Sequence, residues 1–199
     1  LLPMDLVCKL VDATVSRFPA ANSDEAAGLN DFGGVMTFPD QNPYFNLMSL
    51  HPHLLGATSQ LLEVPISELR LSQSDLWPKY GRVPGDRGDL DDQDKRMHLD
   101  YPNHTLTHPP AWDQPEAVEI IVYLCDETDV GGATAVVPRD SHDDVAYRSP
   151  MVNTPGVSDI PWINDRCRAE AWFQKHHPEI AEFRTRLYER EVYAQYRQG

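Results

Sequence analysis

The chain has 199 residues and a formal net charge of −14 at pH 7, from 17 basic and 31 acidic side chains. Nucleic acids and anionic membranes attract clusters of Lys and Arg, so this acidic balance disfavours both as partners. The length suits one domain with a sizeable core, and 17 prolines argue against an all-helical bundle. We therefore expect a single domain over residues 1–199.

The cysteines and the hydropathy pattern disfavour three further classes: disulfide-stabilised, zinc-knuckle and membrane-spanning proteins. Cys8, Cys125 and Cys167 are odd in number and form no C-x-x-C pair, which disfavours a disulfide framework or a zinc knuckle. No apolar run approaches the length of a membrane span. These features favour a cytoplasmic protein without a membrane partner.

The first third of the chain predicts two helices. Met4 to Phe18 carries apolar residues at helical spacing, and Asn22 to Gly34 is expected to be a loop. Asn46 to Val64 predicts a second helix with a Leu-rich face and with Pro52 near its first turn. Ile66 to Leu71 is predicted to be a strand.

A His-x-Asp pair lies in the middle of the chain, where His98 and Asp100 follow the Gly- and Asp-rich stretch Val83 to Lys95. On an extended segment, alternate residues point to the same face. An imidazole and a carboxylate side by side are two ligands of the facial triad that leaves positions open on Fe(II). We predict that both residues bind a metal; the alternative is a surface His beside a solvated Asp.

A hairpin-like pattern follows the pair. Val118 to Asp126 is β-branched and apolar on both faces, which predicts a buried strand. Glu127 to Gly132 predicts a turn, because its two glycines tolerate positive φ. Ala133 to Val137 predicts a returning strand, and the residues from 136 to 142 read VVPRDSH.

The last third predicts helices and then one more strand. Asn164 or Asp165 is expected to cap a helix that continues to Lys175, and Pro178 opens another helix. Val192 to Arg197 switches to a period of two, which is typical of a strand. We therefore expect an α+β, mainly β fold, with a double-stranded β-helix (jelly-roll) core flanked by helices.

Together these motifs resemble the phytanoyl-CoA dioxygenase family of Fe(II)- and 2-oxoglutarate-dependent oxygenases. That family combines H-x-D with a Y-L-x-D strand, a Gly-Gly turn and V-V-P-G-S-H. Here Arg139 and Asp140 stand where the family usually has Gly. Two less specific stretches, Asn30 to Gly34 and Asp75 to Gly81, extend the resemblance along the chain.

The resemblance implies that His98 and Asp100 bind Fe(II), with 2-oxoglutarate and O2 as co-substrates and a small organic molecule as the hydroxylated substrate. Asn103 and Thr105 follow the metal pair and are predicted to hydrogen-bond 2-oxoglutarate. The family's distal His, and an Arg that binds 2-oxoglutarate, would lie beyond Gly199. We therefore expect an internal fragment, incomplete at its C-terminus, which is inactive alone.

Two other functions stay open. A cupin-type metal enzyme would need three His from neighbouring strands, and only His98 lies on a convincing one. A non-catalytic jelly-roll binding protein is the other alternative. A Ser-His-Asp hydrolase is disfavoured because no Gly-x-Ser-x-Gly occurs. Neither the substrate nor the oligomeric state follows from the sequence.

Overall fold

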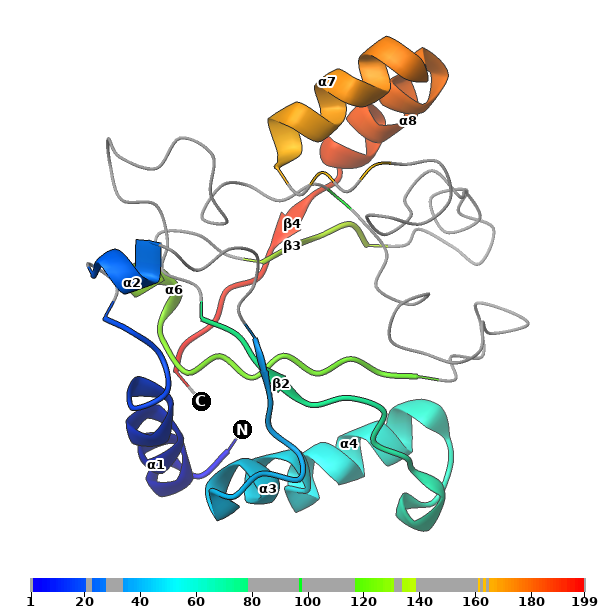
Figure 1. Ribbon diagram of the computed structural model, residues 1–199. Coiled ribbons are helices and arrows are strands. Elements are labelled where there is room, and N and C mark those ends of the chain that lie inside the picture. The colour runs from blue at the N-terminus through cyan, green and yellow to red at the C-terminus, as the bar shows by residue number, and fades with distance from the viewer. Residues whose placement is uncertain are drawn as a thin grey trace. The chain divides into compact units, whose positions relative to one another are not determined.

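A computed structural model describes residues 2–20, 23–27, 34–78, 97, 117–130, 134–138, 161, 163 and 165–198 (Figure 1). These residues group into two compact units, which are described separately. The first unit comprises Leu1–Tyr80, Gln114–Gly131 and Tyr196–Gly199. The second unit comprises Gly81–Asp113 and Gly132–Gln195.

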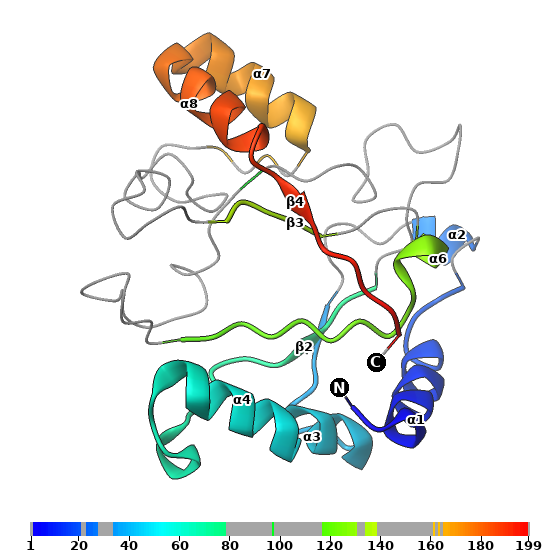
Figure 2. The same ribbon diagram turned by 180° about the vertical axis from the view of Figure 1, so that it is seen from behind.

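Short helices and strands make up both units (Figures 1 and 2). The described elements of the first unit are α1 (Met4–Val15), α2 (Asp24–Ala27), β1 (Val35–Met36), α3 (Pro43–Ser49), α4 (Pro52–Leu62), η1 (Ile66–Glu68), β2 (Asp75–Leu76) and α6 (Glu127–Val130). Those of the second unit are β3 (Ala135–Val136), α7 (Arg166–His176), α8 (Pro178–Tyr188) and β4 (Val192–Tyr193). None of the helices in the described part is long and apolar enough to cross a membrane.

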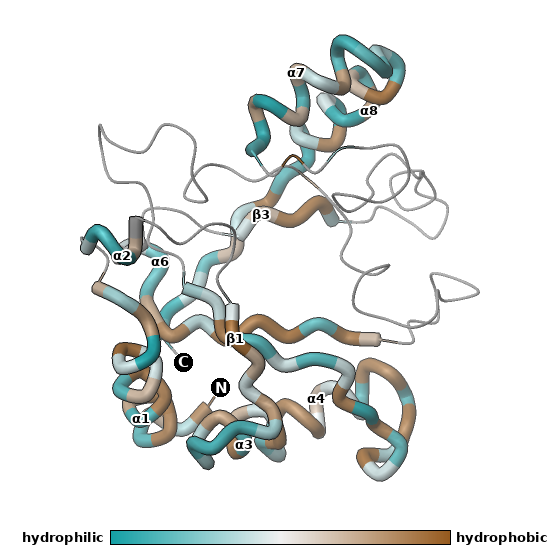
Figure 3. Tube along the Cα trace, viewed as in Figure 1, coloured by the Kyte–Doolittle hydropathy of each residue, from teal (hydrophilic) through white to brown (hydrophobic). Residues whose placement is uncertain are grey.

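The core of the first unit forms between α1 and α3. Val7 and Leu10 of α1 are fully buried, and Phe45 of α3 packs in the same apolar cluster. Apolar residues, brown in Figure 3, recur along α1 at helical spacing, so that one face of the helix is apolar. The helix predicted over Met4 to Phe18 is therefore confirmed, although it ends at Val15.

The single helix predicted over Asn46 to Val64 is wrong, because α3 and α4 divide this segment. Pro52 has no backbone N–H and disfavours the helical region for the residue before it. His51 is accordingly extended, with φ −62° and ψ 131°, and Pro52 begins α4. Asn42 caps α3 by accepting a hydrogen bond of 3.0 Å from the N–H of Tyr44. The sequence pattern predicted neither the break between α3 and α4 nor the cap at Asn42.

Two predicted strands are also wrong. The segment from Ile66 to Leu71 contains the single 3-10 turn η1, and both of these end residues are exposed. The buried strand predicted over Val118 to Asp126 has no regular strand structure in its described residues. Only Val122 and Leu124 of that segment pack against the α1 core. These two residues are partly buried, whereas Ile120 and Ile121 are exposed, so the segment is neither a strand nor fully buried.

The described strands form two antiparallel pairs. β1 pairs with β2 in the first unit, with Val35 opposite Leu76. β3 pairs with β4 in the second unit, with Val136 opposite Val192. The second pair confirms the strands predicted within Ala133 to Val137 and at the start of Val192 to Arg197. The jelly roll itself stays a prediction, since the described residues form two separate two-stranded sheets.

The α7–α8 hairpin confirms the two predicted C-terminal helices. The side chain of Asp165 accepts a hydrogen bond of 2.7 Å from the N–H of Arg168, which caps α7 as expected. Pro178 occupies the first turn of α8. A one-turn helix, α2, lies within the loop predicted over Asn22 to Gly34, and α6 forms the turn predicted after Asp126.

Candidate functional site

The four predicted site residues, His98, Asp100, Asn103 and Thr105, all lie outside the described residues. Met97, which directly precedes His98, is described and belongs to the second unit. The contacts of Met97 therefore define what holds the start of the His-x-Asp segment.

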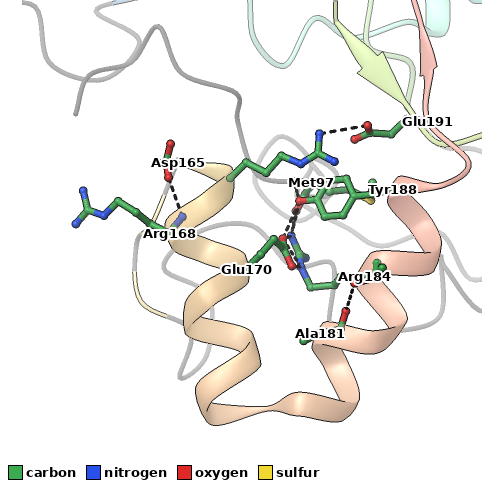
Figure 4. A network of polar contacts seen from close by, with 10 residues as sticks. Met97, Asp165, Arg168, Glu170, Ala181, Arg184, Tyr188 and Glu191 are labelled. Atoms are coloured by element: carbon green, nitrogen blue, oxygen red, sulfur yellow. Dashed lines mark hydrogen bonds and ion pairs between the residues drawn. The ribbon is translucent and has the colours of Figure 1, made fainter. Parts of the chain in front are cut away.

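Both backbone groups of Met97 are bound by side chains of α8 (Figure 4). The carbonyl oxygen of Met97 accepts a hydrogen bond of 3.1 Å from Nη2 of Arg184. The N–H of Met97 donates to the phenol oxygen of Tyr188 at 3.1 Å. Met97 lies 87 residues before Arg184 and 91 before Tyr188, so these are long-range contacts.

A carboxylate on α7 orients both of those side chains. Nη2 of Arg184 donates to Oε1 of Glu170 at 2.6 Å, and Nε donates to Oε1 at 2.8 Å and to Oε2 at 3.0 Å. The hydroxyl of Tyr188 donates to the same Oε1 at 2.7 Å. We call Glu170, Arg184 and Tyr188 the Arg184 cluster. Within it, each charge-assisted bond also fixes a direction in space.

The Arg184 cluster is withdrawn from solvent. The side chain of Arg184 has no exposed surface, and that of Glu170 is 26% exposed. The guanidinium carbon of Arg184 lies 4.5 Å from the ring centroid of Phe173, which is buried on α7. A buried guanidinium is tolerated when a carboxylate and further acceptors compensate its lost hydration, and this arrangement supplies them.

Burial raises the pKa of Tyr188 to about 12. The phenol is therefore neutral at ordinary pH, with its proton available to Glu170 and its oxygen available to the N–H of Met97. The guanidinium carbon of Arg166 also lies 3.7 Å from the centroid of the Tyr188 ring. Arg166 also forms an ion pair of 3.3 Å with Glu191, just after α8.

A second sequence motif contacts the same part of the second unit. Leu187 is buried on α8 and packs against Met97 and Val137. Nη2 of Arg190 donates to the carbonyl oxygen of Pro138 at 2.7 Å. Val137 and Pro138 belong to VVPRDSH, whose last four residues lie outside the described ones. The end of α8 and the residue just after its C-cap therefore contact both Met97 and the start of this motif.

The Y-L-x-D stretch, residues 123–126, contacts the C-terminal segment within the first unit. The ring of Tyr123 stacks on that of Tyr196, with centroids 3.5 Å apart. The side chain of Gln198 donates to the carbonyl oxygen of Leu124 at 3.2 Å, and its N–H donates to Asp126 at 2.6 Å. This stretch is therefore held by side-chain and backbone contacts without a regular strand.

The two less specific stretches of the resemblance also meet in the first unit. Gly34 precedes β1, and Trp77 follows β2. A Cβ atom added at Gly34 would lie 2.6 Å from Cε3 of Trp77, closer than real side chains approach. The position therefore requires glycine unless the indole moves.

Sequence reasoning missed the Arg184 cluster. Of the large apolar residues Ile180, Phe183 and Leu187 on α8, Leu187 alone is buried. The signal that was available is the charged residue one turn before Leu187, since Arg184 lies on the buried side of the helix. Glu170 is the one acidic residue of α7, but spacing along the chain does not show that α7 and α8 pack with these two side chains facing each other.

The described residues contain no group of three or more His, Cys, Asp or Glu side chains placed to hold a metal ion. The fit of a metal therefore depends on the donor chemistry of His98 and Asp100, an imidazole nitrogen with a carboxylate oxygen, which suits Fe(II). Comparison with protein-family models, with curated proteins and with solved structures finds no match for this chain.

Proposed function

We propose that the chain is part of an Fe(II)- and 2-oxoglutarate-dependent dioxygenase that hydroxylates a small organic molecule. One observation carries the proposal: Met97, next to His-x-Asp, and Val137, in VVPRDSH, both pack against Leu187. These motifs are far apart in the sequence, and the resemblance requires that they serve one site. Their contact with the same helix supports that requirement.

The residues of the chain would have separate roles. His98 would give a neutral imidazole to the metal, and Asp100 would give a carboxylate oxygen and a compensating negative charge. Asn103 and Thr105 would offer hydrogen bonds to the bound 2-oxoglutarate. The iron would supply the O2 chemistry, while the protein orients the substrate and excludes water.

The proposal is tested by binding the metal and co-substrate anaerobically to the 199-residue chain. Chelation of Fe(II) by 2-oxoglutarate gives a visible charge-transfer band, which we expect at low intensity for the unaltered chain, because His98 and Asp100 would supply two protein ligands. His98→Ala and Asp100→Ala should each lose the band. His104→Ala is the matched control, because it removes a nearby imidazole outside the predicted ligand pair, and it should keep the band.

The outcomes separate the functions. A chain without any metal affinity, or with affinity unchanged in His98→Ala and Asp100→Ala, contradicts the metal site. Iron binding that depends on His98 but gives no band with 2-oxoglutarate would instead indicate a metal enzyme of the cupin type.

A further inference from the structure

We propose that Glu170, Arg184 and Tyr188 are positioning residues that fix the backbone at Met97, the residue directly before the predicted ligand His98. The inference rests on the proposed function, since it concerns the same metal site. It adds residues of the α7–α8 hairpin, which lie far along the chain from the predicted ligands.

The geometry at Met97 carries the first step. The carbonyl of Met97 shares one rigid peptide plane with the N–H of His98. Arg184 holds that plane through the carbonyl oxygen, and Tyr188 holds the preceding plane through the N–H of Met97. With both planes fixed, the φ and ψ angles of Met97 are fixed as well. The backbone is therefore held up to the peptide bond that follows Met97.

The side chain of Met97 provides a third point of attachment. It packs against Leu187 in the small apolar cluster that also includes Val137 and Phe183. A residue held by its N–H, its carbonyl and its side chain cannot rotate about the chain axis. In an extended segment that rotation decides which face residues 98 and 100 share.

The arrangement is more than is needed to join two helices. The ion pair between Arg184 and Glu170 would connect α8 to α7 by itself. Yet Nη2 of Arg184 also reaches the carbonyl of Met97, and the Tyr188 hydroxyl donates to Glu170 while its oxygen accepts from Met97. Two groups of the cluster are thus directed at one backbone residue beside the predicted ligand.

Residues that orient a metal ligand commonly change metal affinity by about 10- to 100-fold when they are altered. We expect Tyr188→Phe to weaken Co(II) binding to the 199-residue chain by about 10-fold, because Met97 loses the acceptor for its N–H. The visible Co(II) spectrum should change as well, since the geometry of the ligands changes. Tyr44→Phe is the matched control, because it removes a phenol hydroxyl in the first unit, outside the Arg184 cluster.

A conservative variant separates positioning from mere stability. Arg184→Lys keeps the charge but loses the forked donors, so we expect the same spectral change as in Tyr188→Phe. Arg186→Gln, which removes an exposed Arg on the same helix, should leave the affinity and the spectrum unchanged. Circular dichroism shows whether each variant is folded.

Hydrogen exchange of the backbone amide of Met97 tests the inference in the unaltered chain, so it does not depend on the folding of a variant. In the unaltered chain, the amide of Met97 should be protected from hydrogen exchange, since Tyr188 accepts its bond in a partly buried place. Exchange as fast as in an unstructured peptide overturns the inference. So does a folded Tyr188→Phe chain with unchanged Co(II) affinity and spectrum.

Failure of the proposed function has a different signature. If the unaltered chain binds no Co(II), or if His98→Ala binds it equally well, the metal site is absent and the inference falls with it. If binding depends on His98 but is insensitive to Tyr188 and Arg184, the proposed function stands and only the positioning role is overturned.

Discussion

The α1 core and the α7–α8 hairpin bury different kinds of side chain. Val7, Leu10 and Phe45 of the first unit pack in an apolar cluster, with exposed fractions of 0–1%. In the hairpin, Arg184 is just as deeply buried, and it lies beside Phe173. One region depends on shape and apolar area, whereas the other depends on a set of directed polar bonds.

The difference has a functional consequence. Apolar packing has no preferred direction, so it stabilises a unit without fixing the orientation of a particular polar group. Hydrogen bonds and forked ion pairs weaken steeply when they are misaligned, so they hold the groups they join in a defined orientation. The polar region is the one that contacts Met97, next to the predicted ligand His98.

The largest expected effect is on the apolar core. Phe45→Ala should lower the free energy of unfolding of the first unit by about 3–5 kcal/mol, because it leaves a cavity between α3 and α1. Leu47→Ala on the same helix is the control, since Leu47 is 56% exposed and should cost far less. Denaturant unfolding measures both; an equal loss would contradict the assignment of this core.

Removing the buried charge should cost nearly as much. Arg184→Met is expected to lower the stability of the hairpin by about 3 kcal/mol, because Glu170 loses the partner for its carboxylate. Adding Glu170→Leu should restore much of that loss, since no unpaired charge then remains. The double variant sharpens the comparison: it should be stable by denaturant unfolding, yet it leaves the carbonyl of Met97 without the bond from Arg184, so its Co(II) spectrum should change as in Arg184→Lys. An unchanged Co(II) spectrum in the folded double variant would contradict the positioning role.

Two glycines of the first unit should respond in opposite directions. Gly34→Ala should cost about 1–3 kcal/mol, because the added methyl group overlaps the ring of Trp77. Gly56→Ala, in the middle of α4, has open space around its new Cβ and should stabilise the helix by up to about 1 kcal/mol. Thermal unfolding compares them, and a loss at both positions would show that steric overlap is not the cause.

Local signals in the sequence predicted α1, α7 and α8 but not the Arg184 cluster. Helical spacing at Met4 to Phe18 and the cap at Asp165 depend on near neighbours, so they could be recognised from the chain alone. The burial of Arg184 depends on partners 14 and 87 residues away, Glu170 and Met97. No local pattern encodes such distant contacts, and an apolar run such as Val118 to Asp126 cannot report whether a partner strand is present.

The predicted ligands His98 and Asp100 also depend on contacts that a local sequence pattern does not encode. Spacing predicts that His98 and Asp100 share a face only if their segment is extended, and that conformation is set by what holds it. The structure supplies one such contact, at Met97, through residues that the motif does not include. Motif spacing therefore selects the candidate ligands, while long-range polar contacts hold Met97, the residue before them.

The smallest expected effect on stability appears only at high pH. It concerns the α7–α8 hairpin, which contains the buried phenol of Tyr188, and not the apolar α1 core. Burial raises the pKa of Tyr188 from 10.0 to about 12, so the fold favours the neutral phenol. Its contribution to stability is fully present below pH 10 and is lost as the pH rises through 12. The stability advantage of the unaltered chain over Tyr188→Phe should therefore shrink across this range.

Two measurements check this prediction. Phenolate absorbance should show one group titrating near pH 12 that is missing in Tyr188→Phe but present in Tyr196→Phe, the control for the other phenol with a raised pKa. Hydrogen exchange should show the amides of α8 opening in this range before those of α1, whose buried residues carry no titrating group. If α1 and α8 opened together, the two regions would share one cooperative transition, and the polar cluster would not be the separate, directed element that the comparison describes.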